Sequence, residues 1–96
     1  MIYVIDLDKT LVDGPNYLEC KAIPGRIEKV NKLYDEGHTV IIYTARGANS
    51  GLNWFHVTYA MLQRLGVKYT ELRMGEFNYD VWVDDKAIND EEFFDK

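Results

Sequence analysis

The chain has 96 residues, of which 47% are hydrophobic and 14% aromatic, so we expect one folded domain over residues 1–96 and no disorder. Its formal charge of -5 and pI near 4.9 argue against a nucleic-acid partner. Cys20 is the only cysteine, so no internal disulfide can form and a reducing, cytoplasmic location is expected. No apolar run approaches the roughly 20 residues of a membrane span and no signal peptide is recognisable, so we expect no membrane partner.

Apolar segments alternate with amphipathic ones along the chain. Runs rich in β-branched and aromatic residues predict strands at 2–5, 38–43, 67–72 and 81–83. A loop or short hairpin is predicted at 9–23. Periodic apolar residues predict a helix that begins after Pro24-Gly25 and ends at Gly37, a second at 52–65 that ends at Gly66, and a short one at 89–94. This order predicts a three-layer α/β/α sandwich around a small, mostly parallel, Rossmann-like sheet.

Each of the two longer predicted helices has one apolar face. In the first, Arg26 lies off the face, which consists of Ile27, Val30, Leu33 and Tyr34. In the second, the apolar positions are Leu52, Phe55, Tyr59, Leu62 and Leu65. Because such a face packs on the sheet, we expect these side chains in the core, with the aromatic ones there or in a subunit interface.

Polar residues follow three of the predicted strands. Asp6 and Asp8 come after the first strand, Thr44 after the second, and Asp84-Asp85 after the last. The carboxyl ends of parallel strands meet at one edge of a sheet, so these side chains are expected to converge there. A single aspartate at a strand end is more often a turn former than a ligand, but three such signals in register favour a site.

Converging carboxylates raise one another's pKa values, and a bound divalent cation removes that conflict. Oxygen ligands without a His or Cys partner favour Mg²⁺ over Zn²⁺. The sequence therefore predicts a magnesium site at this edge of the sheet.

Three stretches resemble motifs of a known family: "DLDKTLV", "YTAR" and "VWVDDKAIND", which begin at Asp6, Tyr43 and Val81. They are similar to motifs one, two and four of the haloacid dehalogenase (HAD) superfamily of phosphohydrolases. The resemblance spans nearly the whole chain and is closest to short phosphatase-like proteins of capsule and polysaccharide biosynthesis. Only about 15 residues separate Thr10 from the first predicted helix, so the resemblance is to the capless subclass.

The resemblance implies a Mg²⁺-dependent phosphatase acting on a small phosphorylated metabolite, such as a sugar phosphate of polysaccharide biosynthesis. Asp6 would be the nucleophile that forms an aspartyl-phosphate, and Asp8 the general acid and base. Asp6, Asp8 and Asp84 would hold Mg²⁺, with Asp85 behind them.

The resemblance also implies a phosphate-binding set. Thr44 would donate a hydrogen bond to a phosphoryl oxygen, and backbone amides near Leu7 and Ala45 would surround the phosphate. Arg46 either contacts the substrate or is an ordinary surface arginine.

One motif departs from the family. A basic residue is expected shortly before motif four in a "GKP" stretch, but Glu76 and Phe77 stand there. Arg73, Lys68 or Lys86 could replace it, with Arg73 the first choice. The alternative is a catalytically weak or inactive HAD-like module for binding or assembly. A signalling receiver also gathers acidic residues at strand ends, but its acceptor aspartate ends a middle strand, where this chain has Thr44.

A capless site is open to solvent. Specificity must then come from the 11–23 hairpin, from a neighbouring subunit or from a large substrate. Together with the small size and the aromatic content, this predicts a homo-oligomer.

Overall fold

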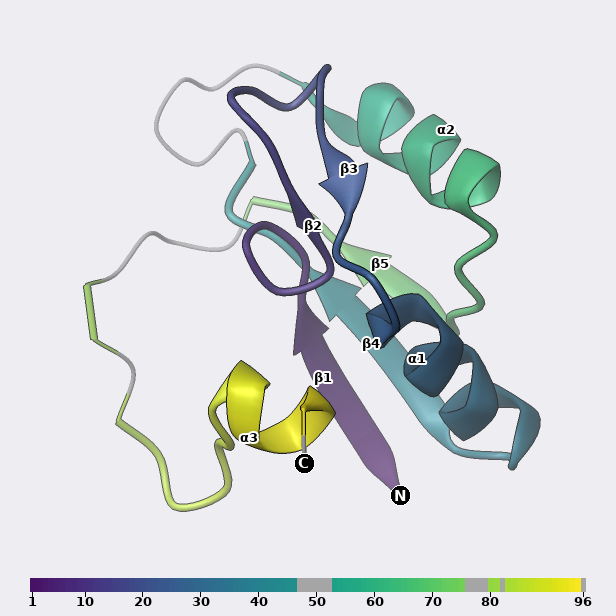
Figure 1. The fold of residues 1–96 in the computed structure, drawn as a ribbon, viewed down its shortest axis with the longest axis vertical. Helices are drawn as coiled ribbons and strands as arrows, with labels where there is room; N and C mark the ends of the chain where they lie inside the picture. Colours follow the sequence, from purple (N-terminus) through teal and green to yellow (C-terminus); the bar gives the residue numbers. More distant parts are fainter. Residues whose placement is uncertain (47–52, 76–79, 82, 96) are drawn as a thin grey trace.

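The computed structural model describes residues 1–46, 53–75, 80–81 and 83–95 (Figure 1). Its strands are β1 (Ile2–Asp6), β2 (Val12–Asp13), β3 (Lys21–Ala22), β4 (Thr39–Tyr43) and β5 (Glu71–Arg73). Its helices are α1 (Arg26–Asp35), α2 (Phe55–Leu65) and α3 (Asp90–Phe94). These elements confirm the predicted order from the first strand to the third, the hairpin and the short final helix. No helix within the described ranges is long and apolar enough to cross a membrane.

The main sheet has the strand order β1-β4-β5, and both of its pairings are parallel. Its register aligns Asp6 with Tyr43, and Tyr43 with Arg73, so the carboxyl ends of the three strands are level. The chain between β1 and α1 forms a separate antiparallel hairpin in which β2 pairs with β3. The hairpin therefore begins directly after the strand end that carries the acidic residues.

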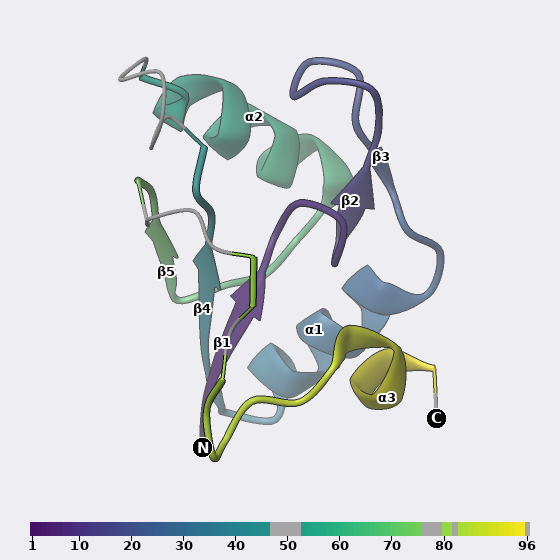
Figure 2. The same cartoon turned by 90° about the vertical axis from the view of Figure 1, so that its left-hand side faces the viewer.

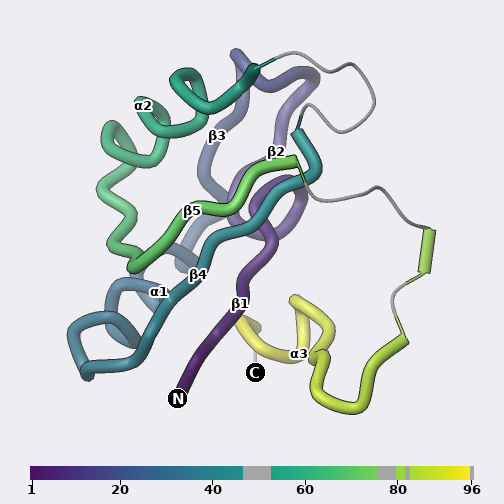
Figure 3. Tube along the Cα trace, turned by 180° about the vertical axis from the view of Figure 1, so that it is seen from behind, coloured from purple at the N-terminus to yellow at the C-terminus, as the bar shows by residue number. Residues whose placement is uncertain are grey.

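All three helices lie on the same face of this sheet. Figure 2 shows the sheet edge-on with α1, α2 and α3 on one side. In Figure 3, which views the molecule from behind, the sheet lies nearer the viewer than the helices. On the opposite face Ile2 is 70% exposed and Val4 is 59% exposed. The described residues thus form two layers, and the predicted third layer is wrong for them. Successive crossovers of one hand that add strands in a single direction place their helices on the same face.

The core lies between the sheet and the helices. Ile5, Val40 and Ile42 face it from the strands. The helices contribute Ile27 and Val30 from α1 and Met61 and Leu62 from α2, and the turn after β1 contributes Leu7 and Leu11. Two of the predicted α1 positions, Ile27 and Val30, are therefore confirmed as core residues.

The predicted face of α2 is only partly right. Leu62 is buried as expected, but Phe55 is 40% exposed and Tyr59 is 45% exposed. Thr58 is fully buried instead, because its hydroxyl accepts a hydrogen bond from a buried arginine described below. Compared with the predicted orientation, α2 therefore turns Thr58 toward the core and leaves the rings of Phe55 and Tyr59 partly exposed.

The predicted strand at 81–83 is not formed by its described residues. Val81 and Val83 lie outside any strand and are 76% and 91% exposed, and Trp82 lies outside the described residues. Figure 1 shows the chain from Val83 to α3 as a loop outside the sheet. In the part of the chain that the structure describes, no strand therefore leads Asp84 and Asp85 to the carboxyl edge.

Candidate functional site

A tight turn directly follows β1. The carbonyl of Leu7 accepts hydrogen bonds from the amides of Thr10 (3.3 Å), Leu11 (2.9 Å) and Val12 (3.2 Å). Within the turn Lys9 adopts a left-handed conformation with φ of 66°, which is uncommon for a residue other than glycine. The turn thus fixes Asp6 at its start and Asp8 within it on a strained backbone.

The turn also uses two of the amides that are expected to bind phosphate. The Leu7 amide donates to the carbonyl of Tyr43 at 3.1 Å, which extends the β1–β4 pairing. The Lys9 amide donates to the carbonyl of Val12 at 2.6 Å. In this structure these two groups are therefore committed to the fold, so the prediction that Leu7 supplies a phosphate-binding amide is not met.

Asp6 is half-buried beside Thr10, whose hydroxyl donates to Asp6 Oδ2 at 3.1 Å. Burial raises the pKa of Asp6 above its ordinary value of 3.8. The hydrogen bonds from Thr10 and from the Leu7 backbone act in the opposite direction, whereas the charges of Asp8 and Asp90 raise the pKa further. The site therefore holds a carboxylate whose ionisation costs more than it does in water.

Asp8 is bound on both oxygens by groups from the end of β4. The hydroxyl of Thr44 donates to Oδ2 at 3.0 Å. Arg46 donates from Nε to Oδ2 at 3.0 Å and to Oδ1 at 3.2 Å, and from Nη2 to Oδ1 at 2.7 Å. A guanidinium that meets a carboxylate through two nitrogens gains geometric specificity as well as energy. Asp8 and Thr44 are therefore brought together as predicted, with Arg46 closing the contact.

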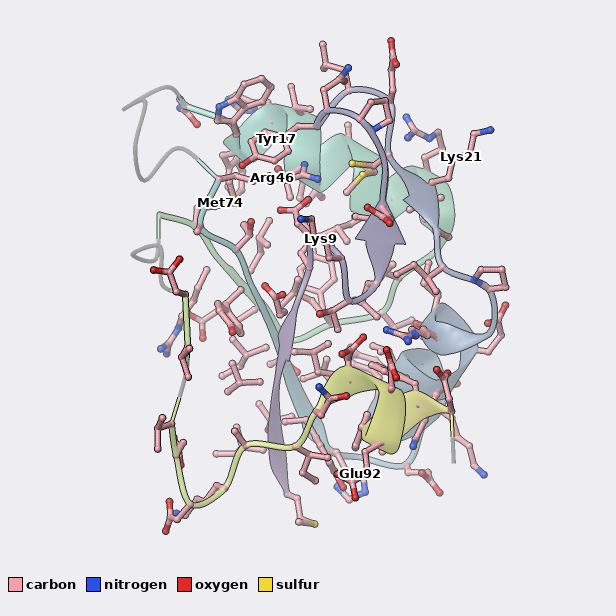
Figure 4. All side chains as sticks on the ribbon, turned by 60° about the vertical axis from the view of Figure 1, so that its left-hand side comes forward. Lys9, Tyr17, Lys21, Arg46, Met74 and Glu92 are labelled. Carbon is pink, nitrogen blue, oxygen red and sulfur yellow. The ribbon has the colours of Figure 1, made fainter. Side chains whose placement is uncertain are left out.

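Arg46 is itself enclosed. Its side chain is fully buried, so one of the two alternatives given for Arg46, an ordinary surface arginine, is wrong, and contact with the substrate stays a prediction. Nη1 donates to the Thr58 hydroxyl at 3.0 Å, Nη2 also lies 3.6 Å from the Cys20 sulfur, and the guanidinium carbon is 4.4 Å from the centre of the Tyr17 ring. Figure 4 shows Tyr17 and Arg46 next to one another at this end of β1. All three guanidinium nitrogens already have partners within the protein.

The Tyr17 ring over Arg46 also contacts an aromatic residue from another segment. Tyr17 belongs to the hairpin between β2 and β3, and Trp54 immediately precedes α2. Their rings meet edge to face with centroids 5.1 Å apart. The hairpin therefore places Tyr17 over Arg46. That the hairpin supplies specificity, which is one of the three alternatives given above, stays a prediction.

The motif-four aspartates do not join this site. Among the described residues, no group of three or more His, Cys, Asp or Glu side chains is placed to hold a metal ion. The Asp84 carboxylate accepts the Lys86 amide at 2.8 Å, and both Asp84 and Asp85 lie in the loop before α3. Because Asp8 is occupied by Arg46, the described residues do not fit the predicted Mg²⁺ set of Asp6, Asp8 and Asp84, and we derive no step through a metal.

The candidate substitute cations have different surroundings. Lys68 donates to both oxygens of Asp35, at 2.8 and 3.1 Å, on the exposed side of α1. The Arg73 carbonyl accepts the Thr44 amide at 3.0 Å, and its Nε donates to Glu71 at 2.9 Å. Arg73 is therefore next to the predicted site through its backbone. Glu76 and Phe77 lie outside the described residues.

Comparisons with known proteins support the fold. No family model matches the sequence, and no curated protein matches it. An MCSG target protein from Vibrio cholerae, solved as a crystal structure, is similar with a TM-score of 0.84 and 24% sequence identity. The match covers 96% of this chain and 85% of that one. At this identity the likeness shows a shared small α/β fold and nothing about activity.

Sequence reasoning missed several polar residues around the site. Thr10, Tyr17 and Thr58 each contact an acidic or basic side chain of the site, as the distances above show, and Arg26 donates to the Thr10 carbonyl at 2.9 Å. One signal was available, since Thr10 stands four residues after Asp6 in a short polar turn. The others become visible only when segments distant in sequence are brought together.

Proposed function

We propose that the chain is a HAD-type phosphohydrolase of the capless subclass that acts on a small phosphorylated metabolite. The observation that carries the proposal is the arrangement at the carboxyl end of β1 and β4: Asp6 and Asp8 on one strained turn, with the Thr44 hydroxyl on Asp8. Ligands of parallel α/β sheets bind at this edge. The finer prediction of a sugar phosphate rests on the sequence resemblance alone.

Asp6 is the proposed nucleophile. Its carboxylate would attack phosphorus, the ester P–O bond would break, and the oxygen of the leaving alcohol would take a proton. Water would then cleave the aspartyl-phosphate and release inorganic phosphate. Burial suits this role because a carboxylate that is poorly solvated is more reactive toward an electrophile, and the Thr10 hydroxyl keeps one oxygen in place.

Asp8 is the proposed acid and base. It lies two residues after the nucleophile on the same turn, and Arg46 and Thr44 hold both its oxygens in place. For proton transfer, one oxygen must exchange its present partner for the leaving group or the attacking water. The proposal therefore requires that at least one of these contacts open when substrate binds.

A second candidate function follows from the same contacts. Both Asp8 oxygens and all three Arg46 nitrogens are engaged internally. Because these groups already have hydrogen-bond partners within the protein, they favour a HAD-like binding or assembly module with little or no turnover. The sequence adds a carboxylate, Glu76, where a cation is expected.

Hydrolysis of a generic aryl phosphate in magnesium-containing buffer tests the proposal. We expect turnover in the parent protein and its loss in Asp6→Asn, while the matched control Asp35→Asn, which alters an exposed ion pair, retains it. Turnover that survives Asp6→Asn would refute the nucleophile. If the parent protein hydrolyses none of a panel of phosphate esters while Glu76→Lys does hydrolyse them, the second candidate, a module with little or no turnover, would be established instead.

A further inference from the structure

The short helix α3 is held against α1 by two cations. Arg26 Nη1 lies 2.6 Å from Asp90 Oδ2, and Nη2 lies 3.2 Å from Asp95 Oδ2. One turn further along α1, the Lys29 ammonium donates to the Phe93 carbonyl and lies 4.0 Å from the centre of the Phe93 ring. Figure 2 shows α3 alongside α1 on the helical side of the sheet. Charge therefore fixes where α3 sits.

The same arginine also contacts the turn after β1. Its Nη1 donates to the Thr10 carbonyl at 2.9 Å, while the Thr10 hydroxyl donates to Asp6 Oδ2 at 3.1 Å. Thr10 is thus held from both sides, by α1 through its carbonyl and by the proposed nucleophile through its hydroxyl. Arg26 is only 6% exposed, although it stands at the first position of α1.

Arg26 keeps its charge in this setting. The hydrogen bond to Asp90 raises the pKa of Arg26, against the opposing effect of burial. A guanidinium is always charged and carries five N–H donors on three nitrogens in a fixed plane, so it can bind two carboxylates and a carbonyl that lie in different directions; a lysine has only three donors, all on one nitrogen. One side chain therefore joins three segments: α3, the start of α1 and the turn that carries the acidic residues.

We infer that Arg26 is a positioning residue that couples the docking of α3 to the geometry of the Leu7–Thr10 turn. With α3 docked, Asp90 and Asp95 orient the guanidinium toward the Thr10 carbonyl. Thr10 in turn directs its hydroxyl at Asp6. The role in catalysis rests on the proposed function, but the coupling itself does not.

Amide hydrogen exchange measures the coupling without any activity. The Leu11 amide reports on the turn because it donates to the Leu7 carbonyl, and the amides of β4 report on global opening. In Arg26→Met we expect Leu11 to exchange about tenfold faster relative to β4, as befits a lost hydrogen bond from a charged group. The exchange rate of Leu11 in Arg26→Lys should fall between those of the parent and Arg26→Met. Asp90→Asn should raise the exchange rate of the Leu11 amide several-fold, although α3 is far from Leu11 in sequence.

The control is Asp35→Asn, which removes an exposed aspartate of the same helix from its pair with Lys68 and should leave the Leu11-to-β4 ratio unchanged. An unchanged ratio in Asp90→Asn and Arg26→Met would overturn the coupling. So would a rise at Leu11 that β4 matches in proportion, because that would mean ordinary destabilisation.

Kinetics test the positioning role separately. If Asp6 is the nucleophile, Arg26→Met should lower kcat about tenfold with KM unchanged, and Arg26→Lys should recover part of the loss. An accelerated Leu11 amide together with an unchanged kcat would refute positioning. A parent protein without turnover would refute the proposed function, and the exchange ratios would still decide the coupling.

Discussion

The ion pair between Arg46 and Asp8 makes a sharp stability prediction. Arg46→Met keeps most of the apolar volume and removes the positive charge, leaving Asp8 without its guanidinium partner and Tyr17 without its cation. Removal of one partner from a buried pair costs about 3–5 kcal/mol. The Asp8 side chain is 30% exposed whereas that of Arg46 is fully buried, so we expect the lower end, about 3 kcal/mol.

Urea unfolding of matched variants measures this cost. The control is Lys68→Met, because Lys68 and Asp35 form a pair of similar length, 2.8 Å, whose side chains are 49% and 55% exposed. That variant should lose at most about 1 kcal/mol. Asp8→Asn combined with Arg46→Met should be less destabilised than the sum of the two single variants, by about 2 kcal/mol.

The reasoning fails if Arg46→Met loses no more stability than Lys68→Met. That result would mean that water reaches the guanidinium and screens it, so that the enclosure by Tyr17 and Thr58 has no energetic meaning. The reasoning also fails if the stability lost in the double variant equals the sum of the losses in the two single variants. That result would show that Arg46 and Asp8 do not stabilise each other.

Three further predictions concern the same end of the sheet. Burial raises the pKa of the Asp6 carboxyl above 3.8, so the folded chain binds the carboxyl proton more tightly than the unfolded chain does. The stability of the fold therefore falls as the pH rises from 3.8 through the raised pKa of the folded state. Thermal melts should show Asp6→Asn to be more stable than the parent at pH 7, and no longer so below about pH 4. Thr44→Val removes the hydroxyl on Asp8 and should cost about 2 kcal/mol in urea unfolding, whereas an unchanged midpoint would contradict that bond. Gly14→Ala would place a Cβ 2.6 Å from the Glu19 carbonyl oxygen, so a loss of about 2 kcal/mol is expected by the same measurement, and a neutral effect would show that the hairpin tip yields.

Elements with strong local signals could be predicted from the sequence. The β-branched runs became β1 and β4, and the helix ends fell where glycine supplies a left-handed residue, at Gly37 with φ of 93° and at Gly66 with φ of 73°. The Asn89 side chain accepts the Glu91 amide at 3.0 Å and so begins the predicted short helix. Such signals act within a few residues, so one sequence is enough to find them.

Features decided by distant partners could not be predicted. Arg26 was placed off the apolar face of its helix, yet it is buried because Asp90 and Asp95, 64 and 69 residues away, neutralise it. Thr58 displaces the aromatic residues from the inner face of α2 for the same kind of reason, since its partner is Arg46. Hydrophobic periodicity assigns polar residues to the surface, and it has no means of recognising a buried pair.

The candidate site shows where this limit matters most. The two aspartates of the turn were found from their position at a strand end, but the residues that hold the turn in place are two arginines from different elements. Arg46 binds Asp8 from the end of β4, and Arg26 binds the Thr10 carbonyl from the start of α1. The turn is therefore held by one cation on each side: Arg46 is balanced by Asp8, and Arg26 by Asp90 and Asp95. A short strained segment needs such support from its surroundings, because its own hydrogen bonds span only a few residues.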